Sequence, residues 1–415
     1  METKEKNVFE QIIAPVTPLM EQEADKLGDD AKKYKLSFIP FTLNILFAII
    51  SGIKSINLLI TYIQTSPVAK ALALVNASNS MYSEAYLRYD PSIYRKIFYA
   101  LLEKLNFLEI PEIKALGKFV CTDGSVFPAI KNMIWASYKT KAKALKLHLS
   151  FELNRMIPVQ FISTEANRSE KAMLLKMLEE GVTYIADRGY VCFNLFNDIC
   201  LKGCHFIIRA KSNLLYEIKE TLTVEIPDKW STFFSEVKDL KIKFKNDKHS
   251  KEYRLVSFVA MGELFILVTD RFDLKTYEII MLYAYRWQVE LIFRFFKRTL
   301  NALHLMCHDP KGIESQFTLY MISYLLLLSF KQKCAPLEES GLNEAEGIVN
   351  NKESKSDSLL QKESSIGDYV CGLVSLLGKR LQRYWKIGIH WLTTVRNLLF
   401  EPFTPEISGI IWAKQ

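Results

Sequence analysis

Two distant segments of this chain share one pattern, an apolar β-type run that reaches an aspartate and then a glycine. Residues 119–125 read Phe-Val-Cys-Thr-Asp-Gly-Ser and contain Asp123, and residues 181–190 read Gly-Val-Thr-Tyr-Ile-Ala-Asp-Arg-Gly-Tyr and contain Asp187. Each segment predicts a short buried strand that ends at its aspartate and continues into a turn. Because α/β sheets present ligand-binding groups at strand ends, both aspartates are candidates for one site. Taken singly, each is more commonly a turn former or a helix N-cap.

A helical segment supplies a third acidic residue at a fixed spacing from one tyrosine and two cations. The pattern is Tyr-x2-Arg-x3-Glu-x6-Lys, formed by Tyr283, Arg286, Glu290 and Lys297. At about 100° per residue, these positions fall within roughly 60° on one helical face. Apolar residues on the opposite side predict a buried stripe: Met281, Tyr285, Val289, Ile292 and Phe296. A solvated face with i,i+4 ion pairs has the same pattern.

The two aspartates and the glutamate together indicate a metal site. Three hard oxygen ligands with open coordination positions suit Mg²⁺ or Mn²⁺, which keep waters and bind phosphate oxygens. Two such ions about 4 Å apart activate a water or a 3′-hydroxyl and stabilise a leaving oxygen. We therefore expect Asp123, Asp187 and Glu290 to meet at one sheet edge and to hold two ions for phosphodiester chemistry.

These motifs resemble those of bacterial transposases of the insertion-sequence-four family, over roughly residues 20–330. The resemblance rests on Thr-Asp-Gly at 122–124, on Asp-Arg-Gly-Tyr at 187–190 and on the four-residue helix signature. It implies a ribonuclease-H-like DDE catalytic domain with a β-rich insertion. In that family the catalytic metal ligands fall at three matching positions: Asp123, Asp187 and Glu290. The family's DNA phosphate contacts near the cut end fall at three others: Tyr283, Arg286 and Lys297.

The length of 415 residues and a hydrophobic content of 49% allow two or three domains with substantial cores. We predict an α/β fold in which a ribonuclease-H-like mixed sheet is flanked by helices and interrupted by the insertion, with helical N- and C-terminal regions. The predicted parts are a helical N-terminal domain (1–110), a catalytic domain (111–209 and 263–333), a β-rich insertion (210–262), a flexible linker (334–368) and a helical C-terminal region (369–415). The N-terminal domain either binds DNA or is a packing subdomain. The C-terminal region either covers the core or provides a dimer or DNA contact.

Two very apolar segments lie outside the predicted strands. Residues 36–63 are interrupted by polar side chains, and residues 316–333 are short and closely followed by lysines. Neither segment provides about 20 uninterrupted apolar residues, so we expect no membrane span. We predict a buried helical pair broken near Gly52 for the first segment, and for the second a core helix packed beneath the sheet.

Basic residues concentrate around the three proposed ligands, while the net charge is a modest +8. One cluster precedes the predicted hairpin and includes Lys143, a second lies in the insertion, and a third lies on the signature helix and includes Arg294. With Arg188 beside Asp187, these residues predict a phosphate track for DNA. In related transposases an aromatic residue of the insertion stacks on a flipped base, and Trp230 is the candidate here, although a core role is the simpler interpretation.

Seven cysteines are scattered singly along the chain. Without a secretion signal, this usage favours reduced thiols in a cytoplasm. Two groupings invite a zinc interpretation: Cys200 with Cys204 and His205, and His304 with Cys307 and His308. Neither has a second half at a finger-like distance, so we expect core or surface roles instead.

The expected function is a cut-and-paste DNA transposase of the bacterial cytoplasm, associated with the nucleoid. Its expected partners are double-stranded DNA, as element terminal inverted repeats and as target DNA, and a second copy of itself on that DNA. One alternative is a Mg²⁺-dependent nuclease on the same fold that does not join strands. Others are an element-derived DNA-binding protein without catalysis and, least favoured, a membrane protein that uses the two apolar segments.

Overall fold

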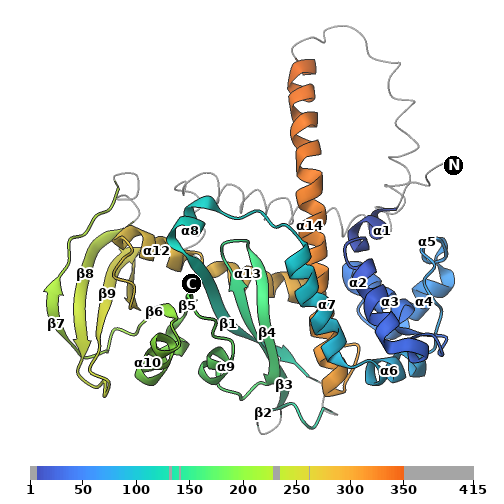
Figure 1. Ribbon diagram of the computed structural model, residues 1–415, viewed down its shortest axis with the longest axis horizontal. Coiled ribbons are helices and arrows are strands. Elements are labelled where there is room, and N and C mark those ends of the chain that lie inside the picture. Colours follow the sequence, from blue (N-terminus) through green and yellow to red (C-terminus); the bar gives the residue numbers. More distant parts are fainter. Residues whose placement is uncertain (1–6, 130–132, 140–141, 228–233, 261, 350–415) are drawn as a thin grey trace. The chain divides into compact units, whose positions relative to one another are not determined.

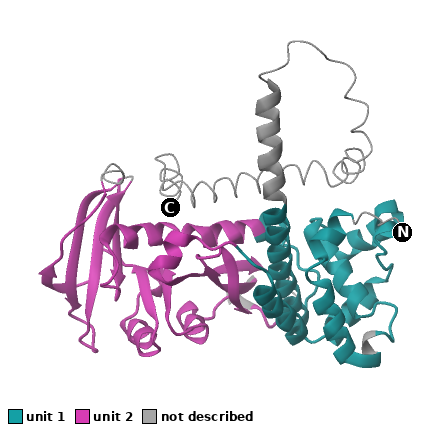
Figure 2. Ribbon diagram, turned by 45° about the horizontal axis from the view of Figure 1, so that its top comes forward, with its two compact units in different colours: residues 1–107, 296–392 teal, residues 108–295, 393–415 magenta. Residues whose placement is uncertain are grey.

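The computed structural model describes residues 7–129, 133–139, 142–227, 234–260 and 262–349 (Figure 1). These residues fall into two compact units (Figure 2). Of the described residues, 7–107 and 296–349 form the helical unit, and those between 108 and 295 form the sheet unit. The predicted catalytic segment 263–333 is therefore divided, because the chain leaves the sheet unit after Phe295. The predicted C-terminal region and most of the predicted linker lie outside the described residues.

The helical unit is built from helices packed around α3, in which nine of 13 residues are buried. Its elements are α1 (Val8–Ile13), α2 (Thr17–Leu27), η1 (Gly28–Ala31), α3 (Phe38–Ile50), α4 (Ile56–Thr65), α5 (Pro67–Ala71), α6 (Asn79–Arg88), α7 (Pro91–Lys104) and α14 (Pro310–Val349). The predicted break in 36–63 is present between α3 and α4, where Gly52 has a positive φ of 68°. The buried Asn44 amide donates to Tyr82 Oη at 2.7 Å and to the Val75 carbonyl at 2.8 Å, which ties α3 to α6 and to the segment before it.

Helix α14 contains the apolar segment that we predicted to lie beneath the sheet, and that prediction is wrong. The helix packs against α7, α3, α1 and α6 within the helical unit, and Arg95 of α7 pairs with Glu314 of α14 at 2.5 Å. Residues Pro310–Lys333 are long and apolar enough to cross a bilayer, but 83% of their most apolar window is buried in the structure, as in a core helix. The helix also continues to Val349, into the predicted linker, where Glu, Leu and Ala recur and are good helix formers.

One mixed sheet organises the other unit. Its strands are β1 (Lys118–Pro128), β2 (Ser137–Lys139), β3 (Ala142–Glu152), β4 (Ile157–Glu165), β5 (Val182–Ala186), β6 (His205–Arg209), β7 (Tyr216–Thr221), β8 (Ser235–Phe244), β9 (Glu252–Ala260) and β10 (Glu263–Thr269). The order is β2-β3-β1-β5-β6-β10-β9-β8-β7, and β4 pairs with β3. Its helical elements are α8 (Pro111–Leu116), α9 (Glu170–Lys176), η2 (Arg188–Tyr190), α10 (Phe193–Leu201), α12 (Thr276–Ala284) and α13 (Trp287–Arg294).

Five of these strands have the ribonuclease-H-like arrangement that the sequence predicted. Strands β1, β3 and β4 form an antiparallel meander, and β5 and β6 then run parallel to β1 on its other side. The crossovers into β5 and β6 contain α9 and α10, as the parallel connections require. The fold class is therefore confirmed by the strand order and directions.

The two faces of this sheet are covered by different helices (Figures 1 and 2). Even-numbered residues of β1, β5 and β6 join α9 and α10 in one buried cluster: Val120, Val182, Tyr184, Phe206 and Ile208 with Leu174, Leu195, Phe196 and Ile199. Helix α13 packs against β1, and α12 packs against β5, β6 and β9. Because side chains alternate along a strand, the odd-numbered residues, Asp123 among them, face away from the α9–α10 layer.

The insertion extends the mixed sheet instead of forming a separate β domain. Strand β10 pairs with β6 and with β9, and β8 and β7 follow at the edge. A buried ion pair fixes this extension: Arg254 Nη2 on β9 lies 2.6 Å from Asp239 Oδ2 on β8. Thr276, the first residue of α12, also donates to Asp239 Oδ2 at 2.7 Å. The insertion is thus bonded directly to the segment that begins the signature helix.

Replacing Asp239 by alanine should lower the free energy of unfolding by about 3–5 kcal/mol, because the buried Arg254 guanidinium would lose its counter-charge. Lys241→Ala is a matched control on the same strand, since it removes an exposed ion pair with Glu252 and should change stability little. Urea unfolding followed by circular dichroism measures both. Equal losses in the two variants would contradict the assigned role of the buried pair.

Candidate active site

The parallel pairing of β1 with β5 brings the two predicted aspartates together. Cys121 of β1 is in register with Ile185 of β5. Two residues further along each chain stand Asp123 and Asp187, on neighbouring strands that run about 4.8 Å apart. Asp123 is an odd-numbered residue of β1, and Asp187, the residue after β5, keeps an extended backbone with φ −86° and ψ −174°. The two carboxylates therefore project from the same face of the sheet.

Asp123 does not end its strand, contrary to the prediction. Strand β1 continues through Gly124, which pairs with His148, and reaches Pro128. Asp123 is partly buried, and its Oδ1 accepts a hydrogen bond from the Gly124 amide at 2.7 Å. Burial raises the pKa of Asp123 to about 7, while Arg286 and the Gly124 amide lower it and Asp187 and Glu170 raise it. Its negative charge is therefore only partly balanced by the protein.

Asp187 follows β5 directly, as predicted, and is also the N-cap of η2. Its Oδ1 accepts a hydrogen bond from the Gly189 amide at 2.7 Å. The two interpretations left open by the sequence, a strand-end ligand and a cap, are thus compatible. The turn holds one carboxylate oxygen and leaves the other without a hydrogen-bond donor among the described residues.

The signature segment is two helices and a turn, not the single helix that we predicted. Helix α12 ends at Ala284, α13 begins at Trp287, and η3 (Phe295–Thr299) follows as a π-helical turn. Across the break the Arg286 amide donates to the Tyr283 carbonyl at 3.0 Å, an i→i−3 bond that tightens the chain. The predicted i,i+4 ion pair is present, with Arg286 Nη2 at 2.9 Å from Glu290 Oε1.

Both faces of the signature segment are buried, so the solvated-face alternative is wrong for its first half. All five residues of the predicted apolar stripe are buried, but so are Tyr283, which is 1% exposed, and Arg286, which is 6% exposed. Tyr283 Oη and Arg286 Nε have no hydrogen-bond partner among the described residues. Buried polar atoms are rarely left unpaired, so these two donors are available to a bound group. The Glu290 side chain is 33% exposed.

The other predicted DNA-binding residues lie on several elements. Arg188 is exposed on η2, and Arg294 is exposed near the end of α13, with its guanidinium 5.9 Å from the centre of the Trp287 ring. Lys297 is partly exposed on η3. Lys143 on β3 donates to the Ile134 carbonyl at 3.1 Å. Trp230 lies outside the described residues.

Glu170, which the sequence analysis did not single out, lies against both aspartate-bearing segments. A methyl group added at Gly124 would be 2.9 Å from Glu170 Oε1, and one added at Gly189 would be 3.6 Å from Glu170 Oε2. Lys146 of β3 holds Glu170 by an ion pair at 3.0 Å. The two glycines thus leave space for this carboxylate next to the site. The only signal in the sequence was its place at the first position of a Ser-capped helix.

The donor set fits a divalent cation, but the ligands are not gathered around one point. Carboxylate oxygens are the ligands that Mg²⁺ and Mn²⁺ prefer, and because burial raises the pKa of Asp123, a nearby cation would favour its charged form. Within the described ranges, no three Asp, Glu, His or Cys side chains lie close enough to hold one metal ion. The expected convergence of three carboxylates is therefore not seen. The physical reason is that Glu290 is turned toward Arg286, whose charge also reaches Asp123.

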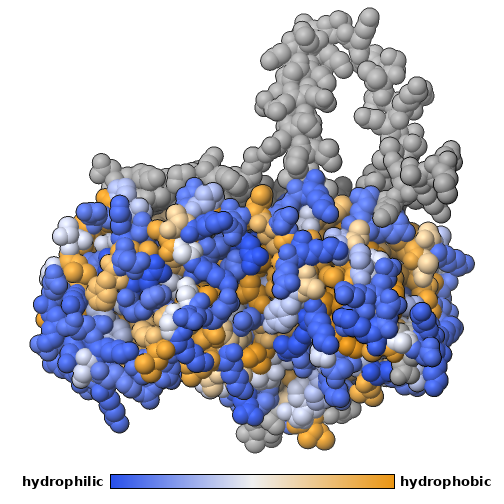
Figure 3. All heavy atoms as spheres, viewed as in Figure 1, coloured by the Kyte–Doolittle hydropathy of each residue, from blue (hydrophilic) through white to orange (hydrophobic). Residues whose placement is uncertain are grey.

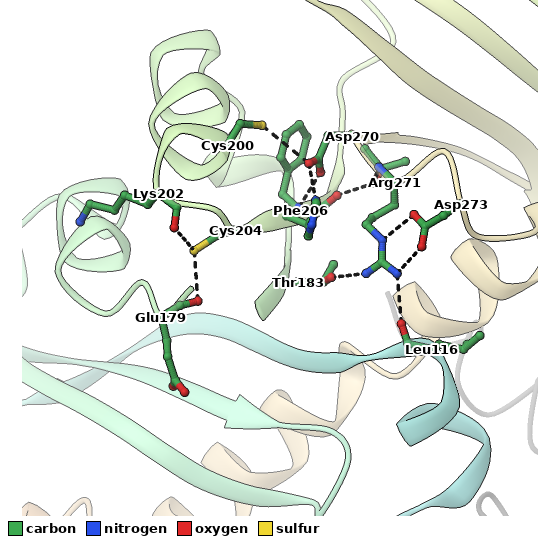
Figure 4. Close-up of polar contacts among 12 residues, drawn as sticks. Leu116, Glu179, Thr183, Cys200, Lys202, Cys204, Phe206, Asp270, Arg271 and Asp273 are labelled. Carbon is green, nitrogen blue, oxygen red and sulfur yellow. Dashed lines mark hydrogen bonds and ion pairs between the residues drawn. The ribbon is translucent and has the colours of Figure 1, made fainter. Parts of the chain in front are cut away.

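The first zinc grouping is separated by its own hydrogen bonds (Figure 4). Cys200 Sγ and His205 Nδ1 both contact Asp270 Oδ2, at 3.7 Å and 2.7 Å, whereas Cys204 Sγ donates to the Glu179 carbonyl at 3.1 Å. The second grouping, around Cys307, forms no metal cluster in the part of the chain that the structure describes.

Several known proteins are similar to the segment that contains these residues. A family model described as the transposase DDE domain matches residues 114–326. The chain is 24% identical over 250 residues to y4zB of Sinorhizobium fredii, which is named as a candidate transposase. The aligned residues cover 59% of this chain and 69% of that protein. It is 23% identical over 240 residues to the transposase assigned to insertion sequence element IS5377 of Geobacillus stearothermophilus, with coverage of 57% and 62%. Among solved structures, endonuclease V of Bacillus subtilis matches 51% of this chain and 95% of its own at 12% identity, but the TM-score of 0.24 carries no weight.

Replacing Gly124 by alanine should lower the free energy of unfolding by about 1–3 kcal/mol, because the new methyl group would press on the Glu170 carboxylate that Lys146 holds in place. The double variant Gly124→Ala/Glu170→Ala should regain most of that loss, since the obstruction is removed. Urea unfolding of the single and double variants tests this. A double variant no more stable than the single one would refute the proposed packing.

Stability should decrease as the pH falls from about 6.5 to about 4, in part because of His148 on β3. Burial, aided by the charge of Lys146, lowers the pKa of His148 from 6.5 to about 4, so the unfolded chain takes up a proton that the folded chain does not. The loss of stability caused by His148 is absent above pH 6.5 and reaches up to about 3 kcal/mol near pH 4. His148→Gln should flatten that part of a stability–pH curve measured by urea unfolding. An unchanged slope would contradict the assignment.

Proposed function

This chain belongs to the family of proteins with the transposase DDE domain, and on that premise we propose that it cuts DNA at the ends of a mobile element and joins those ends to target DNA. The observation that carries the proposal is the register of β1 and β5. It sets Asp123 and Asp187 side by side on one face of the sheet, and α13, which carries Glu290, packs against β1. The curated relatives are transposases by name, and the chain spans 69% and 62% of their lengths.

We propose that Asp123, Asp187 and Glu290 hold the divalent ions, Mg²⁺ or Mn²⁺, and that two ions are used. Bound ions would acidify the attacking water or 3′-hydroxyl and offset charge on the leaving oxygen. Glu290 takes part once its bond to Arg286 is released, which its partial exposure allows. Asp123 and Asp187 need no such change, because the sheet already aligns them.

Arg286 has two tasks in this scheme. Without DNA its guanidinium balances Asp123 and Glu290, two carboxylates that would otherwise repel an anionic substrate. With a phosphate seated at the aspartates, its unpaired Nε and the nearby Tyr283 hydroxyl supply hydrogen-bond donors at a buried position, where such bonds are strongest. Tyr283 and Arg286 therefore contact the phosphate that reacts, and not DNA phosphates further along the duplex.

The cations that are at least partly exposed would position the rest of the duplex. Arg188 and Arg294 are exposed near the ends of η2 and α13, and Lys143 and Lys297 are partly exposed. We assign them to backbone phosphates, contacts that give affinity and register but no sequence preference. The proposed substrates are double-stranded terminal repeats and target DNA. Pairing of two ends implies a homodimer on DNA, in a cytoplasm that keeps cysteines such as Cys121 and Cys200 free.

Glu290→Gln and Asp123→Asn should each reduce Mg²⁺-dependent nicking of element-end DNA at least about 10²-fold, because each removes a charged metal ligand, while duplex binding persists. Glu252→Gln, at an exposed position at the start of β9, is the matched control and should cut normally. Gel assays of nicking and of strand transfer into a plasmid measure the two reactions separately.

Normal nicking by Glu290→Gln would end the assignment of this residue. Nicking by the parent chain without any joining to the plasmid would instead favour the nuclease alternative. Absence of both reactions in the parent chain, with binding intact, would favour a DNA-binding protein without catalysis.

A further inference from the structure

Helix α9 brings one more carboxylate to the candidate site, that of Glu170. Glu170 is the first residue of α9, and Ser169 caps this helix by accepting a hydrogen bond from the Ala172 amide at 3.4 Å. The point where a Gly189 methyl group would lie is 3.0 Å from Asp187 Oδ1 and 3.6 Å from Glu170 Oε2. Both carboxylates therefore have an oxygen within 4 Å of one point, although they belong to different elements.

The strand pairing explains how Glu170 can approach the two aspartates. The parallel pairing of β1 with β5 ends two residues before each aspartate, whereas β1 stays paired with β3 as far as Pro128. Among the described strands, none bonds to the β5 side of β1 beyond that point. The aspartates thus stand where side chains from both helical layers can approach them. Glu170 comes from the α9 layer, and Glu290 belongs to α13.

The charges of the three carboxylates act on the same neighbouring groups. Burial raises the pKa of Tyr190 well above its usual value, and the two aspartates and Glu170 all raise it further. Burial is also the main cause of the raised pKa of Asp123, to which Asp187 and Glu170 add. Within the protein, Lys146 offsets part of this negative charge, since its Nζ lies 3.0 Å from Glu170 Oε1. A further cation would reduce the remaining repulsion.

Two buried donors mark this position independently as one that takes a bound group. Tyr283 Oη and Arg286 Nε have no hydrogen-bond partner among the described residues, and their side chains are buried. The charge of Asp187 acts on Tyr283, and that of Asp123 acts on Arg286. Unpaired donors beside carboxylates suit a ligand that carries both signs of charge, such as a phosphate together with a divalent ion.

The spacing of the carboxylates favours contact through water over direct coordination by all of them. In the part of the chain that the structure describes, no three acidic, His or Cys side chains are close enough to share one ion. Mg²⁺ loses its hydration water reluctantly and usually binds one or two carboxylates. Groups just beyond the ligands then accept hydrogen bonds from that water, and removing them commonly weakens metal binding about 10- to 100-fold.

We propose that Glu170 is a positioning residue of the metal site, whose carboxylate accepts hydrogen bonds from the hydration water of an ion held by Asp123 and Asp187. Lys146 holds Glu170 in place before the ion binds and then competes with the ion for it. The Lys146 and Glu170 side chains are 15% and 28% exposed, so hydrated ions can reach them. Figure 3 shows hydrophilic and hydrophobic side chains interspersed on the face where α9 lies in Figure 1. The proposal rests on the proposed function for the ligands, but it requires no cutting or joining of DNA.

The test measures Mn²⁺ binding to the full chain without DNA, from the loss of the free-ion signal in electron paramagnetic resonance. Glu170→Gln should weaken binding at least about tenfold, because a neutral amide accepts weaker hydrogen bonds than a carboxylate. Lys146→Met should instead strengthen binding at least about twofold, because a cation near the ion is removed. Glu179→Gln is the matched control and should bind like the parent, since Glu179 pairs with Lys118 at the start of β1.

The opposite effects of the two substitutions separate a role at the metal from a structural one. Urea unfolding without metal checks that each variant is folded. If Glu170 only fastened α9 to β3 through Lys146, both variants would lose Mn²⁺ affinity to a similar extent, and the proposal would be refuted. Unchanged affinity in Glu170→Gln, in a chain that Asp123→Asn deprives of Mn²⁺ binding, would also refute it and would leave the proposed ligands intact.

The same measurements distinguish this proposal from the proposed function. A parent chain that shows the expected Mn²⁺ affinities but neither nicks nor joins DNA would support the role of Glu170 and contradict the proposed function alone. A parent chain that binds no Mn²⁺ would overturn both the role of Glu170 and the proposed metal ligands.

Discussion

The active-site arrangement depends on the parallel register between β1 and β5. A shift of one residue would turn one of the two aspartates to the opposite face of the sheet, where α9 and α10 pack. Arg271 secures this register from the far end of the strands (Figure 4). Its guanidinium donates to Thr183 Oγ1 on β5 at 2.5 Å and to the Leu116 carbonyl before β1 at 3.0 Å. Asp273 fixes the same guanidinium with two hydrogen bonds.

The balance of charge determines how the carboxylates are arranged when no substrate is bound. Asp123 is buried enough for its pKa to rise to about 7, and Asp187 and Glu170 add negative charge beside it. Arg286 is the cation that opposes this charge, and its bond to Glu290 keeps the third carboxylate away from the pair of aspartates. Arg286, one helical turn before Glu290, therefore sets the position of the Glu290 side chain. Substrate phosphate and divalent ions would compete for these interactions.

The sequence was informative wherever a local pattern decides the outcome. The length of the apolar run before Asp187 placed it correctly at a strand end, and the i,i+4 spacing of Arg286 and Glu290 correctly indicated an ion pair. The glycine after Asp123 was misleading, because Gly124 does not form a turn. Its missing side chain makes room for Glu170, a neighbour from a distant helix that no local pattern could identify.

The sequence pattern also could not predict which helices and strands pack against one another. The apolar stripe of α14 indicates burial but not against which element, and its partners are α7 and α3 in the helical unit. The break at Arg286 carries no Gly or Pro and results from i→i−3 bonding in a fully buried segment. Strand β1 exceeded its predicted length because β3 pairs with it as far as Pro128.

The shared sheet connects the insertion to the strands and the helix that precede the candidate ligands. Strands β8 and β9 are continuous through β10 with β6 and β5, and Asp239 is bonded to both Arg254 and Thr276 at the start of α12. A displacement of the edge strands would therefore be transmitted through the hydrogen-bonded sheet, and through the Asp239 bond to Thr276, to the helix that precedes the Glu290 segment.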